Sequence, residues 1–178
     1  MTNTAKRTVV ATVAAVVVAC GVVAAGYAAG ARICTTRSIP VGLYWVSHSA
    51  VAKGSYVQLC PPPGGLFDEA RARGYVTSGP CPGSYGYLMK RVAALAGDVV
   101  AFEDDGVHVN GQVLPHSRPV ATDPGGRPLP RLRANRRSLS NSEVLLMSDV
   151  SDSSFDGRYF GPIGLSQIRT VVRPVVTW

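Results

Sequence analysis

The most informative stretch of this chain reads Tyr85-Gly86-Tyr87-Leu88-Met89-Lys90-Arg91-Val92-Ala93-Ala94-Leu95. Its aromatic and apolar residues predict a β-strand, and they surround one lysine with side chains suited to a core. The same strand signal recurs along the chain, at residues 41–48, 55–60, 99–103, 107–114, 143–147 and 168–176. Many short strands with few helices predict a mostly β fold.

Turn residues separate these predicted strands. Ala52-Lys53-Gly54 joins the strands at 41–48 and 55–60 by a turn, and Asn110-Gly111 is a strong hairpin signal. A single short helix is expected at 67–73, with acids early, arginines late and Gly74 as its stop. Residues 115–137 are rich in Pro, Gly and Arg and keep neither period, so we expect a long surface loop or a small irregular insertion at about 115–140.

Residues 8–31 form an uncharged run of mostly Val, Ala and Gly. As a helix this run would extend about 36 Å, enough to cross a hydrocarbon core about 30 Å thick. Cleavage after the small residues 28–31 and lipidation at Cys20 are alternatives, but a signal peptide has a shorter apolar region. We therefore expect one uncleaved transmembrane helix at the N-terminus.

Lys6 and Arg7 precede the apolar run, whereas Arg32 and Arg37 follow it. Basic residues before the run favour a cytoplasmic N-terminus. The predicted organisation is then a cytoplasmic N-terminus and anchor at 1–31, followed by one periplasmic domain at 32–178. The expected location is a bacterial inner membrane, with a single pass.

The chain is basic, with 18 Lys and Arg against 11 Asp and Glu, a net charge of +7. Part of this excess lies in one Pro-rich and Gly-rich stretch of the loop, which carries five arginines: Arg127, Arg131, Arg133, Arg136 and Arg137. Such a loop attracts nucleic acid or anionic lipid headgroups. In a membrane-tethered protein the lipid needs fewer assumptions, so we expect inner-membrane lipid and no nucleic acid as a partner.

Three of the four cysteines lie beyond the apolar run, where an oxidising compartment would permit pairing. Cys60 and Cys81 bracket a Pro-rich and Gly-rich excursion. A disulfide closing it would stabilise the fold by about 3 kcal/mol. Free buried thiols are the alternative.

Candidates for chemistry are few. The three histidines lie in or beside strand-like or loop stretches with no acid placed so as to suggest a catalytic pair, and neither C-x-x-C, H-E-x-x-H nor a G-x-S-x-G elbow occurs. A serine paired with a lysine remains: Ser38, in Ser38-Ile39-Pro40, and Lys90. A lysine that accepts a proton near neutral pH needs its pKa lowered by roughly three units, about 4 kcal/mol, which only burial supplies.

These residues resemble the motifs of type I signal peptidases. Ser38-Ile39-Pro40 is similar to the family's S-M-x-P box, and the stretch from Lys90 to Val100 is similar to its K-R-V-x-x-x-P-G-D box. The stretch 148–161 is similar to G-D-N-x-x-x-S-x-D-S-R-Y-x-G, and Lys53-Gly54-Ser55-Tyr56-Val57 sits where K-G-D-x-V is expected. The resemblance implies a signal-peptidase-like β domain with short helices and irregular insertions.

The departures from these motifs point to a subgroup. Ile39 replaces the family's methionine, and Ser148 and Val150 replace its glycine and asparagine. The Ser-Ile-Pro-Val-Gly-Leu-Tyr start and the small size most resemble the TraF-type peptidases of conjugative plasmid transfer. That resemblance implies a pilin precursor as substrate, further pilus-assembly proteins as partners, and in some members cyclisation of the pilin.

Residue roles follow from the same resemblance. Ser38 would attack the scissile carbonyl and Lys90 would act as general base, with no cofactor or metal. The oxyanion would be received by the Ser38 backbone N–H and the Thr36 hydroxyl. Supporting roles fall to Ser154, which would hold the lysine, and to the pair Asp156 and Arg158. The hypothesis of a Ser38–Lys90 peptidase also predicts a small apolar substrate pocket beside Ser38, lined by Ile39, Val41 and the Lys90 strand.

The position of Ser38 also bears on the substrate. It lies seven residues beyond Ala31, so even an extended link reaches only about 25 Å from the membrane. This favours a membrane-embedded precursor. Three alternatives remain: a general secretory signal peptidase, a non-catalytic pilus-assembly scaffold, and a soluble autoproteolytic repressor, which the apolar run disfavours.

Overall fold

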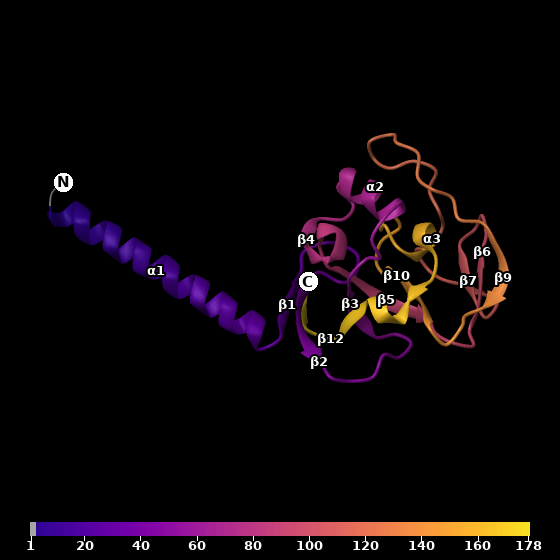
Figure 1. Ribbon diagram of the computed structural model, residues 1–178, viewed down its shortest axis with the longest axis horizontal. Coiled ribbons are helices and arrows are strands. Elements are labelled where there is room, and N and C mark those ends of the chain that lie inside the picture. The colour runs from indigo at the N-terminus through magenta and orange to yellow at the C-terminus, as the bar shows by residue number, and fades with distance from the viewer. Residues whose placement is uncertain (1–2) are drawn as a thin grey trace. The chain divides into compact units, whose positions relative to one another are not determined.

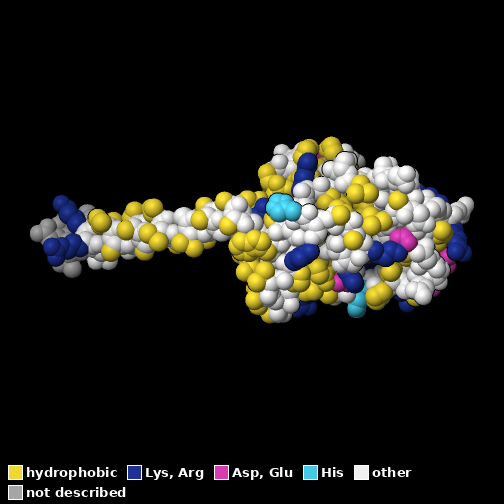
Figure 2. Space-filling view, turned by 90° about the horizontal axis from the view of Figure 1, so that it is seen from below, with side chains coloured by type: hydrophobic (Ala, Val, Ile, Leu, Met, Phe, Trp, Pro, Cys, Tyr) yellow, Lys and Arg dark blue, Asp and Glu magenta, His cyan; other side chains and the backbone are white. Residues whose placement is uncertain are grey.

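The computed structural model describes residues 3–178 and divides the chain into two compact units, Met1–Arg32 and Ile33–Trp178 (Figure 1). The first unit contains helix α1, Asn3–Ala28. Its part Ala5–Ala28 is long and apolar enough to cross a membrane, with a mean hydropathy of 2.5. Hydrophobic side chains are exposed along α1, and basic side chains lie toward its N-terminal end (Figure 2).

The second unit is built on two β-sheets. The larger has seven strands in the order β1 (Ala31–Cys34), β2 (Gly42–Ser47), β12 (Ile168–Thr177), β3 (Tyr56–Leu59), β5 (Leu88–Ala94), β10 (Glu143–Met147) and β11 (Ile163–Gly164). The smaller has four, in the order β8 (Gln112–Val113), β7 (Val107–Val109), β6 (Val99–Phe102) and β9 (Ala134–Ser138). The predicted mostly β fold is confirmed, with one helix suited to span a membrane.

Short elements complete this unit: α2 (Leu66–Ala72), β4 (Ser78–Cys81), α3 (Gly157–Phe160), and the 3-10 turns at Pro82–Ser84 and Leu165–Gln167. Helix α2 lies within one residue of its predicted bounds and carries Asp68 and Glu69 in its first turn. Gly74 follows it with φ +80°, a conformation that a residue with a Cβ rarely adopts.

Strand β5 is an interior strand of the larger sheet, which explains why its lysine is buried. It pairs with β3 on one side and β10 on the other, with Lys90 opposite Val57. Neighbouring strands cover its backbone, while Val92 and Ala94 join the core. The Lys90 side chain is 1% exposed, so the predicted strand carries its lysine into the interior.

The strands predicted at 41–48 and 55–60 are present as β2 and β3, and β12 lies between them in the sheet. Two expectations about the elements need correction. Residues 134–138 of the expected loop form β9, an edge strand whose backbone pairs with β6. Its side chains are mostly exposed and include two arginines, so the sequence lacks the alternation of apolar and polar residues that predicts a strand. In addition to the predicted helix, the structure has a second short helix, α3. Asp156 caps the N-terminus of α3.

The excursion between β3 and β5 is tied down at its base. Cys60 and Cys81 form a disulfide, one of the two states that the sequence leaves open for them, whereas Cys20 and Cys34 are free. Inside the excursion, Phe67 of α2 packs against Tyr85 and against Phe155, which lies outside the excursion. The excursion is therefore fixed to the segment that precedes α3.

Candidate active site

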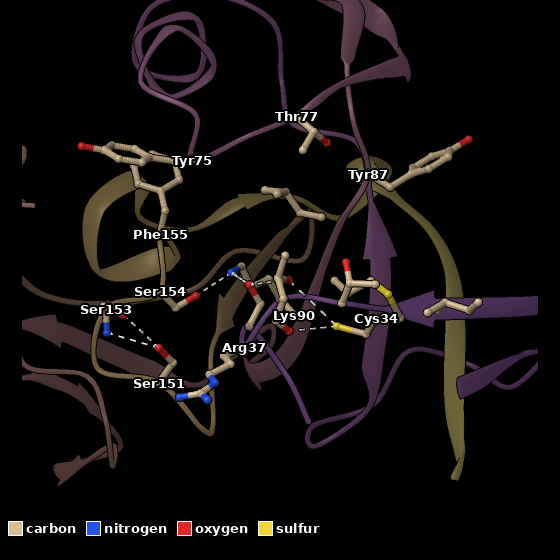
Figure 3. Close-up of a pocket in the computed structure, with 16 residues that line it drawn as sticks. Cys34, Arg37, Tyr75, Thr77, Tyr87, Lys90, Ser151, Ser153, Ser154 and Phe155 are labelled. Carbon is tan, nitrogen blue, oxygen red and sulfur yellow. Dashed lines mark hydrogen bonds between the residues drawn. The ribbon is translucent and has the colours of Figure 1, made fainter. Parts of the chain in front are cut away.

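The residues predicted to form the catalytic pair lie in hydrogen-bond contact. Lys90 Nζ on β5 donates to Ser38 Oγ at 2.9 Å and to Ser154 Oγ at 2.7 Å (Figure 3). Ser38 lies in the turn between β1 and β2, and Ser154 precedes α3. Three segments far apart in sequence thus converge on one ammonium group.

Burial sets the charge state of this lysine. Removal from water disfavours the ammonium form and lowers the pKa of Lys90 from 10.5 to about 8, an effect that the Asp156 carboxylate partly opposes. Arg158 adds to the lowering by repulsion. The lysine is therefore within reach of neutrality near physiological pH, as a general base requires.

Asp156 and Arg158 form a fully buried ion pair beneath the site. Arg158 donates through Nε and a terminal nitrogen to the two Asp156 oxygens, both at 2.8 Å. Asp156 also accepts from the backbone N–H of Ser148 at 2.9 Å, and Arg158 donates to the carbonyl of Asp152 at 2.6 Å. The ion pair is thus hydrogen-bonded to the backbone at Ser148 and at Asp152, and it holds in place the segment that carries Ser154.

The Thr36 side chain lies beside Ser38. Its hydroxyl donates to Ser38 Oγ at 3.5 Å, a long contact, and its side chain is exposed. The Thr36 carbonyl accepts from the buried thiol of Cys34 at 3.2 Å, which holds the turn onto β1. The Thr36 hydroxyl is therefore a hydrogen-bond donor at the edge of contact with Ser38 Oγ.

A cavity of about 360 Å³ opens at the catalytic pair. One side is formed by Ile33, Cys34 and residues 87–89, and the other by Tyr75, Ser153 and Phe155. In Figure 3, Lys90 lies between the Cys34 side and the Tyr75 and Phe155 side. A polypeptide crossing this cavity would pass over Ser38.

The predicted pocket residues lie elsewhere. Ile39 is 0% exposed and packs with Tyr44, Met89 and Val172, anchoring the turn that carries Ser38 to the core. Neither Ile39 nor Val41 is among the residues lining the cavity. The Lys90 strand does line it, as expected, through Leu88 and Met89.

Sequence reasoning missed Tyr75 and Thr77, which enter the cavity wall from the disulfide-bonded excursion. This excursion lies outside the motifs, so no local signal connected it with Ser38. Packing of Phe155 between Phe67 and Tyr75 makes the connection, with ring centroids 6.0 Å and 5.5 Å away.

Among the residues that the structure describes, one group has possible metal-ligand atoms within 4.8 Å of one another: Glu103, Asp105 and His108. His108 Nε2 lies 2.9 Å from Asp105 Oδ1, and this contact raises the pKa of the imidazole. His108 lies on β7 and the two acids lie in the loop between β6 and β7, and none of the three lines the cavity at Ser38. They therefore supply nothing to the chemistry there.

Comparison with known proteins gives consistent matches. Residues 1–178 match the family described as signal peptidase, peptidase S26. The chain is 61% identical over 174 residues to plasmid transfer protein TraF of Escherichia coli, covering 98% of this chain and 96% of that protein. It is 39% identical over 157 residues to conjugal transfer protein TraF of Agrobacterium tumefaciens strain 15955, covering 87% of each. A signal peptidase I from Enterococcus faecalis V583 is 16% identical, with a TM-score of 0.39, over 71% of this chain and 100% of that chain.

Proposed function

Because this chain belongs to the signal peptidase family, peptidase S26, we propose that it is a membrane-anchored serine endopeptidase with Ser38 as nucleophile and Lys90 as general base. The observation that carries the proposal is the buried Lys90 Nζ, 2.9 Å from Ser38 Oγ. A hydroxyl needs a neighbouring base to become a nucleophile, and the histidines do not line the cavity at Ser38.

The first half of the reaction is acylation. With a pKa of about 8, about a tenth of the Lys90 side chains are neutral at pH 7. Neutral Lys90 takes the proton of Ser38 as Oγ attacks the scissile carbonyl, and then gives a proton to the departing amine. The Ser38 N–H and the Thr36 hydroxyl receive the oxyanion, while Ser154 keeps the lysine aimed at Ser38.

The second half releases the acyl group from Ser38. Lys90, neutral again, takes a proton from the incoming nucleophile as this attacks the ester, and it returns a proton to Ser38 Oγ as the ester bond breaks. If water attacks, the product is a free carboxylate; if an amine of the same substrate attacks, the product is a ring. The buried Asp156–Arg158 pair holds the Ser154 segment in place through both halves.

The substrate we propose is a conjugative pilin precursor, which this protein cleaves for mating-pilus assembly. The same site could also join the ends of the cleaved pilin into a ring. Support comes from the names of the relatives, which are plasmid transfer and conjugal transfer proteins. Helix α1 would anchor residues 1–31 in the inner membrane, with residues 32–178 as the periplasmic peptidase domain. The short link to Ser38 suits a precursor held in the same bilayer, alongside other pilus-assembly proteins.

Co-expression with the pilin precursor tests this proposal. We expect the pilin to lose mass with the wild-type protein, and to keep its full mass with Ser38→Ala or Lys90→Ala present at equal levels. A further deficit of one water would identify cyclisation. Full mass in all three would remove the pilin as substrate, and processing that survives both substitutions would remove the mechanism.

General secretory signal-peptide removal is a second candidate, because it would use the same residues. The same experiment with a secretory precursor separates the two substrates. A non-catalytic scaffold is a third candidate, in which Ser38→Ala would leave mating intact. The hydrogen bonds that converge on Lys90 favour catalysis over a scaffold, since a scaffold gains nothing from a buried ammonium.

A further inference from the structure

A second cavity, of about 620 Å³, adjoins the catalytic one. Tyr75, Ser153 and Phe155 line both. The rings of Tyr75 and Phe155 lie 5.5 Å apart between centroids, so the boundary between the cavities is largely aromatic (Figure 3). A chain that crosses Ser38 toward these rings therefore arrives at the second cavity.

Two segments that lie outside the family motifs supply much of the wall of the second cavity, and residues of the 148–161 motif complete it. Tyr75 comes from the disulfide-bonded excursion, and the stretch 120–129 comes from the Pro-rich loop. Direct bonds join the two segments. The Tyr75 hydroxyl donates to Asp123, and Arg73 donates to the carbonyl of Pro128. The Tyr159 hydroxyl receives the Val120 N–H, which fastens the loop to α3.

The charges in the cavity wall are paired with each other. Asp123 is 6% exposed and accepts from the Arg127 backbone N–H at 2.8 Å and from Arg127 Nε at 2.6 Å. The remaining wall includes apolar surface from Val120, Leu129 and Tyr159. Because these two charges already neutralise each other, an ionic group gains less here than an apolar group, which would exchange water for hydrocarbon contacts.

We propose that this cavity is a specificity subsite, which takes an apolar side chain of the polypeptide that Ser38 cleaves. The assignment rests on the proposed peptidase function and extends it to the class of residue recognised near the scissile bond. The two insertions act as one wall, since the Tyr75–Asp123 and Arg73–Pro128 bonds join them across the cavity.

Val120 allows a clean test, because it lines this cavity and not the one at Ser38, and is 42% exposed. Val120→Arg would place a charge in the subsite. Val113 on β8 lines neither cavity and is 52% exposed, so Val113→Arg is the matched control. The probes are internally quenched peptides spanning the pilin cleavage site, with Leu or Asn, which are similar in shape, at each position in turn.

The full-length proteins in detergent are compared by kcat/KM. For the wild type and Val113→Arg, we expect one position where Leu is preferred to Asn by about tenfold. Val120→Arg should lose that preference, keep its rate on the Asn peptide, and keep the preferences at other positions. An undiminished preference in Val120→Arg, an equal loss on both peptides, or no preference in the wild type would each overturn the subsite alone. No cleavage of any peptide by the wild type would overturn the peptidase function and the subsite with it.

Discussion

In the mechanism we propose, Lys90 sets the pH at which this protein works. Only its neutral form accepts the Ser38 proton, and burial lowers its pKa to about 8. We expect kcat/KM to rise about tenfold per pH unit up to about pH 8 and then to level off. The measurement is a pH–rate profile on a cleavable peptide. A rate that stays flat from about pH 6 to pH 9 would contradict a lysine base.

Burial of Lys90 also costs stability, with a definite pH dependence. Below pH 8 both folded and unfolded chains carry the proton; between pH 8 and 10.5 only the unfolded chain does. The free energy of unfolding therefore rises with pH across this window, by about 3 kcal/mol for a shift from 10.5 to about 8. Above the window Lys90 is neutral in both states and the rise ends.

Lys90→Met removes this titration. We expect the variant to be more stable than the wild type near pH 7 and to lose the rise between pH 8 and 10.5, measured by denaturant unfolding at several pH values. The control is Lys53→Met, a side chain 50% exposed, which should keep the wild-type rise. A rise that persists in Lys90→Met would assign the titration to another group.

At the scale of elements, the strands follow from their residues while their neighbours do not. The stretch around Lys90 predicts β5 because apolar and aromatic side chains suit a pleated, covered surface. Local pattern carries no information on pairing partners, so the position of β12 between β2 and β3 could not be predicted. Helix α3 is too short to show a period, and its cap at Asp156 is visible only in the structure.

The site divides in the same way. The contacts of Lys90 with Ser38 and Ser154 could be anticipated from the motifs, because each motif supplies one group. The cavity wall could not, because Tyr75 reaches it through packing between distant segments. Proximity to Ser38 in sequence predicts that Ile39 lines the substrate pocket. In the structure Ile39 is buried in the core instead, where it anchors the turn that carries Ser38.

The disulfide is the element-scale feature most open to experiment. It closes a loop with a sequence separation of 21, so Cys60→Ala with Cys81→Ala should lower the free energy of unfolding by about 3 kcal/mol. Thermal unfolding with and without reductant measures the effect. Reductant should destabilise the wild type and leave the double variant unchanged. Equal sensitivity of both proteins would mean that the bond contributes nothing.

At the scale of the whole molecule, the central issue is which side of the membrane holds the peptidase domain. Lys6 and Arg7 precede α1, and basic residues near a span are retained in the cytoplasm. We expect alkaline phosphatase fused after Trp178 to be active and a green fluorescent protein fused there to be dark. The reverse pattern would place Ser38 on the cytoplasmic side, away from a periplasmic precursor.

The most direct test of the mechanism is to locate the covalent intermediate. Purified full-length protein is mixed with pilin precursor, stopped with acid during the first turnover, digested and mapped by mass spectrometry. We predict an acyl fragment of the precursor esterified to Ser38, and no such fragment with Lys90→Ala. A fragment on another residue, or cleavage by Ser38→Ala, would contradict the Ser38–Lys90 assignment.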